Sequence, residues 1–188
     1  MTNATTPPQW TYALRTYARP GVADACLQLQ ARCNVDVVVM LHAMYAFDKL
    51  GVRLDADTLA AADAHVRAWR EQVTVPLRAL RTALKGGFSA LPASAVEAAR
   101  QKIKIAELEA ESAAFAALAP FTGGTPARGG DTAQAETLLD AVVALYAAAV
   151  DNGSSGDAPA KAAVRTLSMA ICASAPGLDR PVRGDGPR

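Results

Sequence analysis

The hydrophobic positions along the chain recur at spacings of three and four residues, which is the period of an amphipathic helix. Val22, Cys26, Leu29 and Cys33 show this period most cleanly, following one another at four, three and four residues. Proline, glycine and capping residues interrupt the pattern at intervals, so each periodic stretch predicts one helix. The predicted helices span residues 8–18, 20–32, 35–50, 57–85, 94–119, 132–150 and 159–173.

Two of these stretches need a decision between alternatives. Residues 37–39 are three consecutive valines, which favour a strand, but the length of the apolar run and its stop at Gly51 favour a helix. Pro76 lies inside the 57–85 stretch and is expected to kink this helix without ending it, because the apolar stripe resumes in phase. The capping residues expected at three helix starts are Asn34, Ser94 with Glu97, and Asp131 with Gln134.

These elements predict an all-α fold, a compact bundle of about seven helices with a long central antiparallel hairpin. The apolar set of the 132–150 helix is wide enough for two contacts, so a homodimer is expected. The segment that precedes the last two helices, residues 121–130, is rich in Gly, Thr and Pro, which is typical of a linker. The predicted organisation is a helical core domain over 1–120, a linker over 121–130, a C-terminal helical pair over 131–175 that packs on the core or on a dimer partner, and a disordered tail over 176–188.

Composition and charge narrow the class of protein. Hydrophobic residues make up 51% of the 188 residues but aromatic residues only 5%, so the helices are expected to pack closely through small side chains. The net charge of +1 argues against binding through bulk charge, and no nucleic-acid partner is expected. The longest apolar stretch, 141–150, is about half as long as a membrane helix, so no membrane span is predicted. Three cysteines without close spacing and a polar N-terminus without a signal-peptide pattern predict a cytoplasmic protein.

Charged residues follow two complementary seams on the predicted hairpin. If the hairpin turns near residue 90, Arg70 faces Glu111 or Glu107. By the same geometry Arg81 faces Glu97. We interpret the seams mainly as a ladder of ion pairs between the helices. The alternative is a basic groove for an anionic ligand or partner, because arginine recognises phosphate and carboxylate groups with paired hydrogen bonds. The seams consist of Arg67, Arg70, Arg78, Arg81 and Lys85 on the first helix and Glu97, Glu107 and Glu111 on the second.

The sequence contains no recognisable catalytic arrangement. His42 and His65 are the only histidines, and their spacing from the nearest aspartates, Asp48 and Asp63, places each pair on different helix faces. Both histidines are therefore expected to be satisfied beside the core. The chain lacks the histidine and glutamate spacings of metal sites, so no metal, no cofactor and no catalytic residue is predicted.

The segment WTYALRTYARPGVADACLQLQ, from Trp10 to Gln30, resembles a family of small proteobacterial proteins of unknown function. The similarity continues through Asp36-Val37, AWR at 68–70, PLRALR at 76–81 and ELEAE at 107–111, and spans residues 10–118. The resemblance implies a cytoplasmic helical protein and implies no activity, substrate or cofactor.

Two classes of function follow. The first is a non-enzymatic adaptor or regulatory interaction protein with an unknown protein partner, because paired charges are visible whereas pairs of nucleophile and base are not. The second is a protein that binds a small anionic ligand or a lipid, with or without enzymatic activity, in an apolar cavity lined by Trp10, Tyr17, Tyr45 and Trp69. A closed core favours the first class, and a cavity with arginine or histidine at its mouth favours the second. The candidate binding residues are Arg67, Arg70, Arg78, Arg81, Trp69, Tyr45 and His42.

Overall fold

The computed structural model describes residues 6–147 and 157–173 of the chain. Over these residues the protein is almost entirely helical, which confirms the all-α prediction. The predicted helix end at 148–150, the turn at 151–156 and the tail at 176–188 lie outside the described residues. The elements are α1 (Pro8–Tyr17), α2 (Val22–Cys33), α3 (Val37–Tyr45), the π-helical turn η1 (Ala46–Leu50), β1 (Val52–Leu54), α4 (Ala56–Trp69), the π-helical turn η2 (Arg70–Thr74), α5 (Val75–Ala83), the 3-10 turn η3 (Leu84–Gly86), α6 (Ala93–Leu118), β2 (Gly124–Pro126), α7 (Thr132–Ala147) and α8 (Ala158–Cys172).

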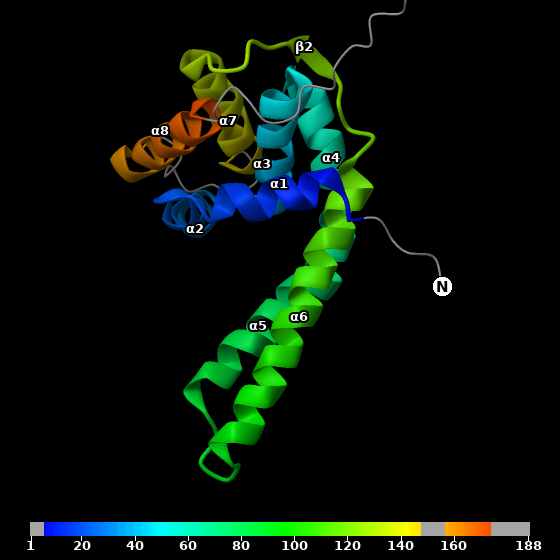
Figure 1. The fold of residues 1–188 in the computed structure, drawn as a ribbon, viewed down its shortest axis with the longest axis vertical. Coiled ribbons are helices and arrows are strands. Elements are labelled where there is room, and N and C mark those ends of the chain that lie inside the picture. The colour runs from blue at the N-terminus through cyan, green and yellow to red at the C-terminus, as the bar shows by residue number, and fades with distance from the viewer. Residues whose placement is uncertain (1–5, 148–156, 174–188) are drawn as a thin grey trace, which may run out of the picture.

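Helices α1–α4, α7 and α8, with the C-terminal end of α6, form a globular part that we call the body (Figure 1). Its core is one continuous cluster, in which Leu29, Met44 and Leu139 are completely buried. Ala43 and Ala62 are completely buried as well. Small side chains therefore let the helix backbones approach closely, as the composition predicted.

The C-terminal helices α7 and α8 pack against each other and against α2. Val142 and Leu167 belong to the same buried cluster as the apolar faces of α2 and α3. Arg19 donates a hydrogen bond to the carbonyl of Ala170 near the end of α8. The described part of this helical pair thus packs on the rest of the body, whereas a domain boundary at residue 120 and a homodimer stay predictions.

The turn between α2 and α3 differs from the expected one. Asn34 adopts the left-handed conformation, with φ of 55°, and ends α2 instead of capping α3. Asp36 caps α3, because its Oδ1 accepts the backbone N–H groups of Val38 at 2.7 Å and Val39 at 3.3 Å. Residues 37–39 are helical, so the alternative of a strand is wrong.

The predicted helix over 57–85 is a continuous helical rod made of α4, η2, α5 and η3, and it begins after the capping residue Asp55. The π-helical turn η2 lies directly before Pro76, and in it the N–H of Val75 donates to the carbonyl of Arg70, five residues back. Proline has no N–H and disturbs a regular helix. The wider turn accommodates it, and the rod continues past the proline as predicted.

Residues 75–111, comprising α5, the loop after it and the first part of α6, form an antiparallel hairpin that we call the arm (Figure 1). The arm extends well beyond the body. No residue of α5 is buried, and Leu80 is 51% exposed. The hairpin is therefore formed as predicted, but its far end projects into solvent.

Two capping predictions had opposite outcomes. The cap at Asp131 is confirmed, because its carboxylate accepts the backbone N–H of Gln134 at 3.1 Å and the side-chain amide of Gln134 at 2.8 Å. The capping box at Ser94 is wrong, because α6 begins one residue earlier and has no side-chain cap. Glu97 binds Arg100 in its own helix, at 2.7 and 2.8 Å.

Residues 121–130, predicted as a linker, contain β2, which pairs antiparallel with β1. Gly124 lies opposite Leu54 in this ladder. A Cβ atom at Gly124 would lie 2.1 Å from the carbonyl oxygen of Arg53, so only glycine permits the two backbones to approach this closely. The glycine that suggested a linker is therefore a requirement of the strand pairing.

Candidate binding site at the base of the arm

A cavity of about 360 Å³, which we call the apolar cavity, lies between α1, α2, α3 and the base of the arm. Trp10 and Phe115 form part of its wall, with ring centroids 5.8 Å apart in a tilted arrangement. Its volume lies within the range of small-molecule sites, which are lined mainly by hydrophobic and aromatic side chains with a few polar groups. The other lining residues are Ala13, Leu14, Tyr17, Ala18, Leu27, Gln30, Val37, Val38, Leu41, Arg78, Arg81, Glu107, Leu108 and Glu111.

Exposed hydrophobic side chains surround the apolar cavity. Leu14 on α1 is 49% exposed, Leu27 on α2 is 53% exposed and Leu108 on α6 is 38% exposed. Hydrophobic residues gathered around one depression on a protein surface commonly mark a binding site. The cavity is therefore bordered by the kind of surface that a ligand or partner covers.

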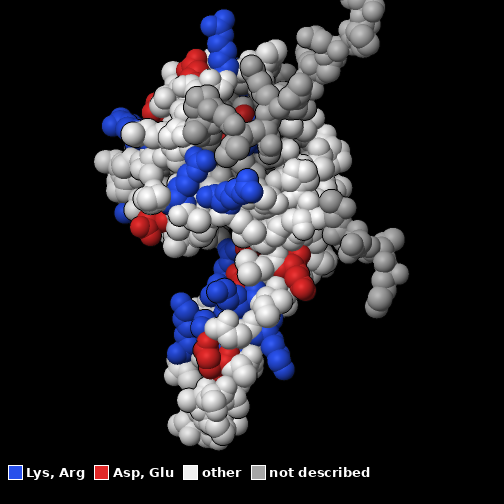
Figure 2. All heavy atoms as spheres, in the orientation of Figure 1, with Lys and Arg blue, Asp and Glu red and all other residues white. Residues whose placement is uncertain are grey.

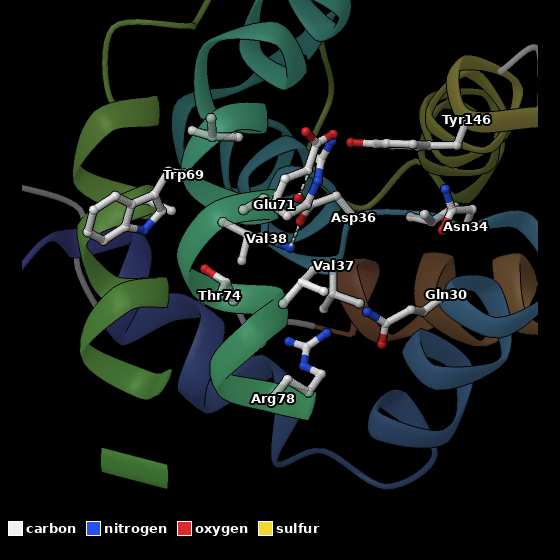
Figure 3. Close-up of a pocket in the computed structure, with 15 residues that line it drawn as sticks. Gln30, Asn34, Asp36, Val37, Val38, Trp69, Glu71, Thr74, Arg78 and Tyr146 are labelled. Carbon is white, nitrogen blue, oxygen red and sulfur yellow. Dashed lines mark hydrogen bonds and ion pairs between the residues drawn. The ribbon is translucent and has the colours of Figure 1, made fainter. Parts of the chain in front are cut away.

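A second cavity of about 240 Å³, which we call the polar cavity, adjoins the first (Figure 3). Figure 3 shows Gln30 from α2 and Arg78 from α5 reaching toward Val37. Asn34 and Thr74 add an amide and a hydroxyl group to the lining. Within the described part of the chain no hydrogen bond is found to the side-chain amides of Gln30 and Asn34. The residues that line both cavities are Gln30, Val37, Val38 and Arg78.

An ion network with buried carboxylates contributes Asp36, Arg70 and Tyr146 to the wall of the polar cavity. The guanidinium group of Arg70 donates to Asp36 and to Asp63, both at 2.6 Å. Arg67 donates to Asp63 at 2.6 Å, and the hydroxyl of Tyr146 donates to it at 2.7 Å. Burial favours the neutral form of Asp63, but these donors outweigh burial and hold its pKa below the usual range. The network joins α3, α4 and α7 around one charged carboxylate.

Ion pairs also join the two helices of the arm. Arg78 binds Glu107 at 3.0 Å and Glu111 at 2.7 Å, and Arg81 binds Glu107 as well. The predicted ladder between the helices is therefore formed. One of its predicted rungs is wrong, because Arg81 binds Glu107 instead of Glu97.

The pairing predicted for Arg70 is also wrong. Arg70 binds Asp36 and Asp63 instead of Glu107 or Glu111, and Asp36, the residue that caps α3, lies outside the hairpin. Every arginine of the predicted basic seam thus has a carboxylate partner, whereas Lys85 at its end has none among the described residues. The guanidinium donors that an anionic ligand needs are engaged within the protein. The paired arginines are Arg67, Arg70, Arg78 and Arg81, and their partners are Asp36, Asp63, Glu107 and Glu111.

The two carboxyl groups at the apolar cavity differ in their tendency to hold a proton. Burial raises the pKa of Glu111, and the positive charge of Arg78 offsets this only in part. Burial acts in the same direction on Glu107, but hydrogen bonds from Arg81 and Arg78 outweigh it and lower the pKa of Glu107. Glu111 is therefore the carboxyl group of this site that protonates more readily.

The aromatic residues that were expected to line one apolar cavity are distributed between the two cavities and the core. Trp10 and Tyr17 line the apolar cavity, as predicted, and Trp69 lines the polar cavity. The indole N–H of Trp69 donates to the carbonyl of Ala110 at 3.0 Å, so this residue also fastens α6 to α4. Tyr45 lines neither cavity, because it packs edge-on against Tyr12 at 5.5 Å.

His42 is completely buried in the core and lines neither cavity, so neither cavity supports its predicted place among the binding residues. Its Nε2 lies 2.8 Å from the carbonyl oxygen of Phe121 and donates a hydrogen bond to it. Its Nδ1 is buried without a hydrogen-bond partner in the described part of the chain. Burial lowers the pKa of His42, so the imidazole is neutral.

Sequence reasoning missed the residues that separate the two cavities. Gln30 from α2 and Val37 from α3 line both cavities because of tertiary packing, which hydrophobic periodicity does not report. Over the described ranges, no group of three or more metal-ligating side chains lies together. None of the helices in those ranges combines the length and apolar character needed to cross a membrane.

The chain belongs to the family described as Protein of unknown function (DUF2390), which it matches over residues 8–118. No curated protein and no solved structure shows significant similarity to it. The matched region contains the whole lining of the apolar cavity and all of the polar cavity except Tyr146. The candidate site therefore lies almost entirely in the part of the chain that defines the family.

Proposed function

We propose that the protein binds a small amphiphilic molecule at the base of the arm. The apolar part of this molecule occupies the apolar cavity, and an uncharged polar group lies beside Gln30. The observation that carries the proposal is that two cavities of contrasting character share one wall, formed by Gln30, Val37, Val38 and Arg78. Ligand sites commonly combine an apolar volume with a few polar groups that fix orientation.

The ion pairs favour an uncharged polar group on the ligand. Arg78 already binds both Glu107 and Glu111, and Arg70 binds Asp36 and Asp63. A carboxylate or phosphate ligand would have to displace one of these partners and leave it buried, which is costly. The side-chain amide of Gln30 can donate and accept hydrogen bonds, so it suits a hydroxyl or amide group.

The same contacts favour binding over chemical conversion. A general base needs an available lone pair and a nucleophile within hydrogen-bond reach. Asp36, Asp63 and Glu107 each accept charged hydrogen bonds from at least one arginine. We therefore place the function in the class of binding proteins.

The first experiment measures binding of the uncharged fluorescent probe N-phenyl-1-naphthylamine. Replacing Leu14 by Trp fills part of the apolar cavity, and Leu14 is exposed enough for the larger side chain to be tolerated. We expect Leu14→Trp to weaken probe binding at least about tenfold, because losing the burial of about two CH₂ groups costs about 1.5 kcal/mol. The matched control is Ala60→Trp, at an exposed position of α4 outside both cavities, which should bind the probe like the unmodified protein. Equal binding by both variants would show that the probe lies elsewhere and would overturn the proposal.

The second experiment tests the polar group of the ligand by competition. We expect 1-octanol to displace the probe at lower concentration than octanoate does, because the arginines at the site are already paired. Replacing Gln30 by Leu should weaken displacement by 1-octanol several-fold while leaving binding of the probe itself intact. Stronger displacement by octanoate would restore the anionic ligand that the sequence suggested.

A second candidate function is that of an adaptor, and the exposed rim of the apolar cavity favours it. Leu14, Leu27 and Leu108 are positioned to contact the apolar face of a helix from a partner protein. In this case Leu27→Ser with Leu108→Ser should abolish partner binding. The small probe should still bind this double variant, since most of the cavity wall is unchanged.

A further inference from the structure

The far end of the arm is an uncharged loop with exposed hydrophobic side chains. Residues 86–96 contain no acidic or basic residue. Phe88 is 50% exposed and Leu91 is 57% exposed, and the N–H of Leu91 donates to the carbonyl of Phe88 at 3.0 Å, which closes a turn. Figure 2 shows the end of the arm without charged side chains. We call residues 86–96 the tip.

Basic side chains lie directly behind the tip. Of the five basic residues within 79–106, Arg81 and Arg100 are paired with Glu107 and Glu97, and the other three are lysines. Lys85 adjoins the tip on one side, and Lys102 and Lys104 follow on α6. All three lysines are exposed and form no ion pair within the described part of the chain. In Figure 2 blue side chains lie above the uncharged end, with some red carboxylates among them.

We infer that the tip docks on an anionic membrane surface. Phe88 and Leu91 enter the boundary between headgroups and acyl chains, and the lysines behind them contact anionic headgroups. Hydrophobic side chains with adjacent basic residues bind membrane interfaces in this way without spanning the bilayer. The distance between the hydrophobic tip and the lysines is suitable for this arrangement. The helical rise puts Lys102 about 14 Å behind the start of α6. A long lysine side chain can reach the headgroup layer from there.

The shape of the arm favours a membrane over a protein partner. The tip is the apex of a projecting hairpin (Figure 1), and neither of the two cavities lies at it. A convex apex can contact a planar lipid surface directly. A protein partner would need a pocket of complementary shape to bind the same apex. This inference is independent of ligand binding at the base of the arm, since the two surfaces share no residue.

The test is sedimentation of the full chain with lipid vesicles at low ionic strength. We expect binding to vesicles of phosphatidylcholine with about one third phosphatidylglycerol and little binding to phosphatidylcholine alone. Replacing Phe88 and Leu91 by Ser should weaken binding about tenfold. The matched control replaces two equally exposed hydrophobic residues of the body, Leu50 and Met169, by Ser and should bind like the unmodified chain.

A second pair of variants tests the charge. Lys85→Gln with Lys102→Gln should weaken binding at least about tenfold. Arg15→Gln with Lys161→Gln removes the same charge from the body and should have little effect. In a further variant, Phe88→Trp, the added fluorescence should shift to shorter wavelength on the anionic vesicles.

Three outcomes would overturn the inference. The first is equal loss of binding in tip and body variants, and the second is equal binding to neutral and anionic vesicles. The third is the absence of vesicle binding with no spectral shift in Phe88→Trp, which would leave a protein socket as the occupant of the tip. Circular dichroism of each variant checks that the helices are intact.

Discussion

The body and the arm of this protein are stabilised by different interactions. In the body, Phe47, Leu29 and Met44 are completely buried within a continuous hydrophobic cluster, whereas no residue of α5 in the arm is buried. The arm is joined instead by ion pairs that Arg78 and Arg81 make with the facing helix. Burial of apolar surface contributes more free energy than partly exposed ion pairs. We therefore expect the arm to open locally while the body stays folded.

The largest effect is expected from removing the helices that close the body. Truncation after Pro120 deletes α7 and α8, whose residues Leu139 and Leu167 are completely buried in the shared cluster. We expect the truncated chain to lose cooperative thermal unfolding, because it exposes the facing surfaces of α2 and α3. Calorimetry and light scattering measure this. A sharp transition in a monomeric truncated chain would show instead that residues 1–120 are an independent domain.

The next largest effect is expected at the junction of body and arm. Arg70→Met leaves Asp36 and Asp63 buried without their common partner and should lower the free energy of unfolding by about 3 kcal/mol. Urea denaturation measures the loss. A double-mutant cycle with Asp63→Asn should show a coupling of about 1–3 kcal/mol, whereas the cycle with Glu111→Gln should show none. Coupling to Glu111 instead would mean that the hairpin pairing inferred from the sequence is populated.

A smaller and more local effect is expected within the arm. Arg81→Met removes one of the two arginines that bind Glu107. We expect amide hydrogen exchange in residues 93–107 to become about five to ten times faster, with no change in α2 and α3. A uniform acceleration across the molecule would contradict the separation of arm and body.

The smallest effect is a dependence of stability on pH that belongs to the body. Burial lowers the pKa of His42, so the unfolded chain takes up a proton before the folded protein does as the pH falls through about 6.5. Stability should therefore fall below that pH, by at most about 1.4 kcal/mol per pH unit. Urea denaturation at pH 7.5 and 5.5 should show a smaller difference for His42→Gln than for the unmodified protein. His65→Gln, at an exposed site, is the control.

Much of the helical architecture could be predicted because local signals agree with the hydrophobic period. The stop at Gly51 and the cap at Asp131 follow from such signals. The error at the start of α3 arose because Asn34 and Asp36 are both typical capping residues and lie two positions apart. Only the packing of α2 against its neighbours decides that the first ends one helix and the second begins the next.

The candidate site was predictable only in part. Helix geometry placed the arginine and glutamate seams on facing sides of the hairpin, which the ion pairs of Arg78 and Arg81 confirm. The ion pair of Arg70 with Asp36 could not be predicted in this way, because Asp36 lies outside the hairpin and contacts Arg70 only through tertiary packing. The cavities were equally inaccessible, since a cavity is a space left between helices and leaves no period in the sequence.

The π-helical turn η2 sets the angular register of the arm relative to the body. Its extra residue shifts α5 about the rod axis relative to α4. Folding the same five residues as a regular helix, with no residue removed, would rotate everything beyond this turn by roughly 100°. Arg78 and Arg81 would then turn away from Glu107, while the contacts of α4 with the core would be unchanged. Substitutions along the arm can be tolerated one at a time, but a regular turn in place of η2, at the same chain length, would disconnect the arm from its own ion pairs.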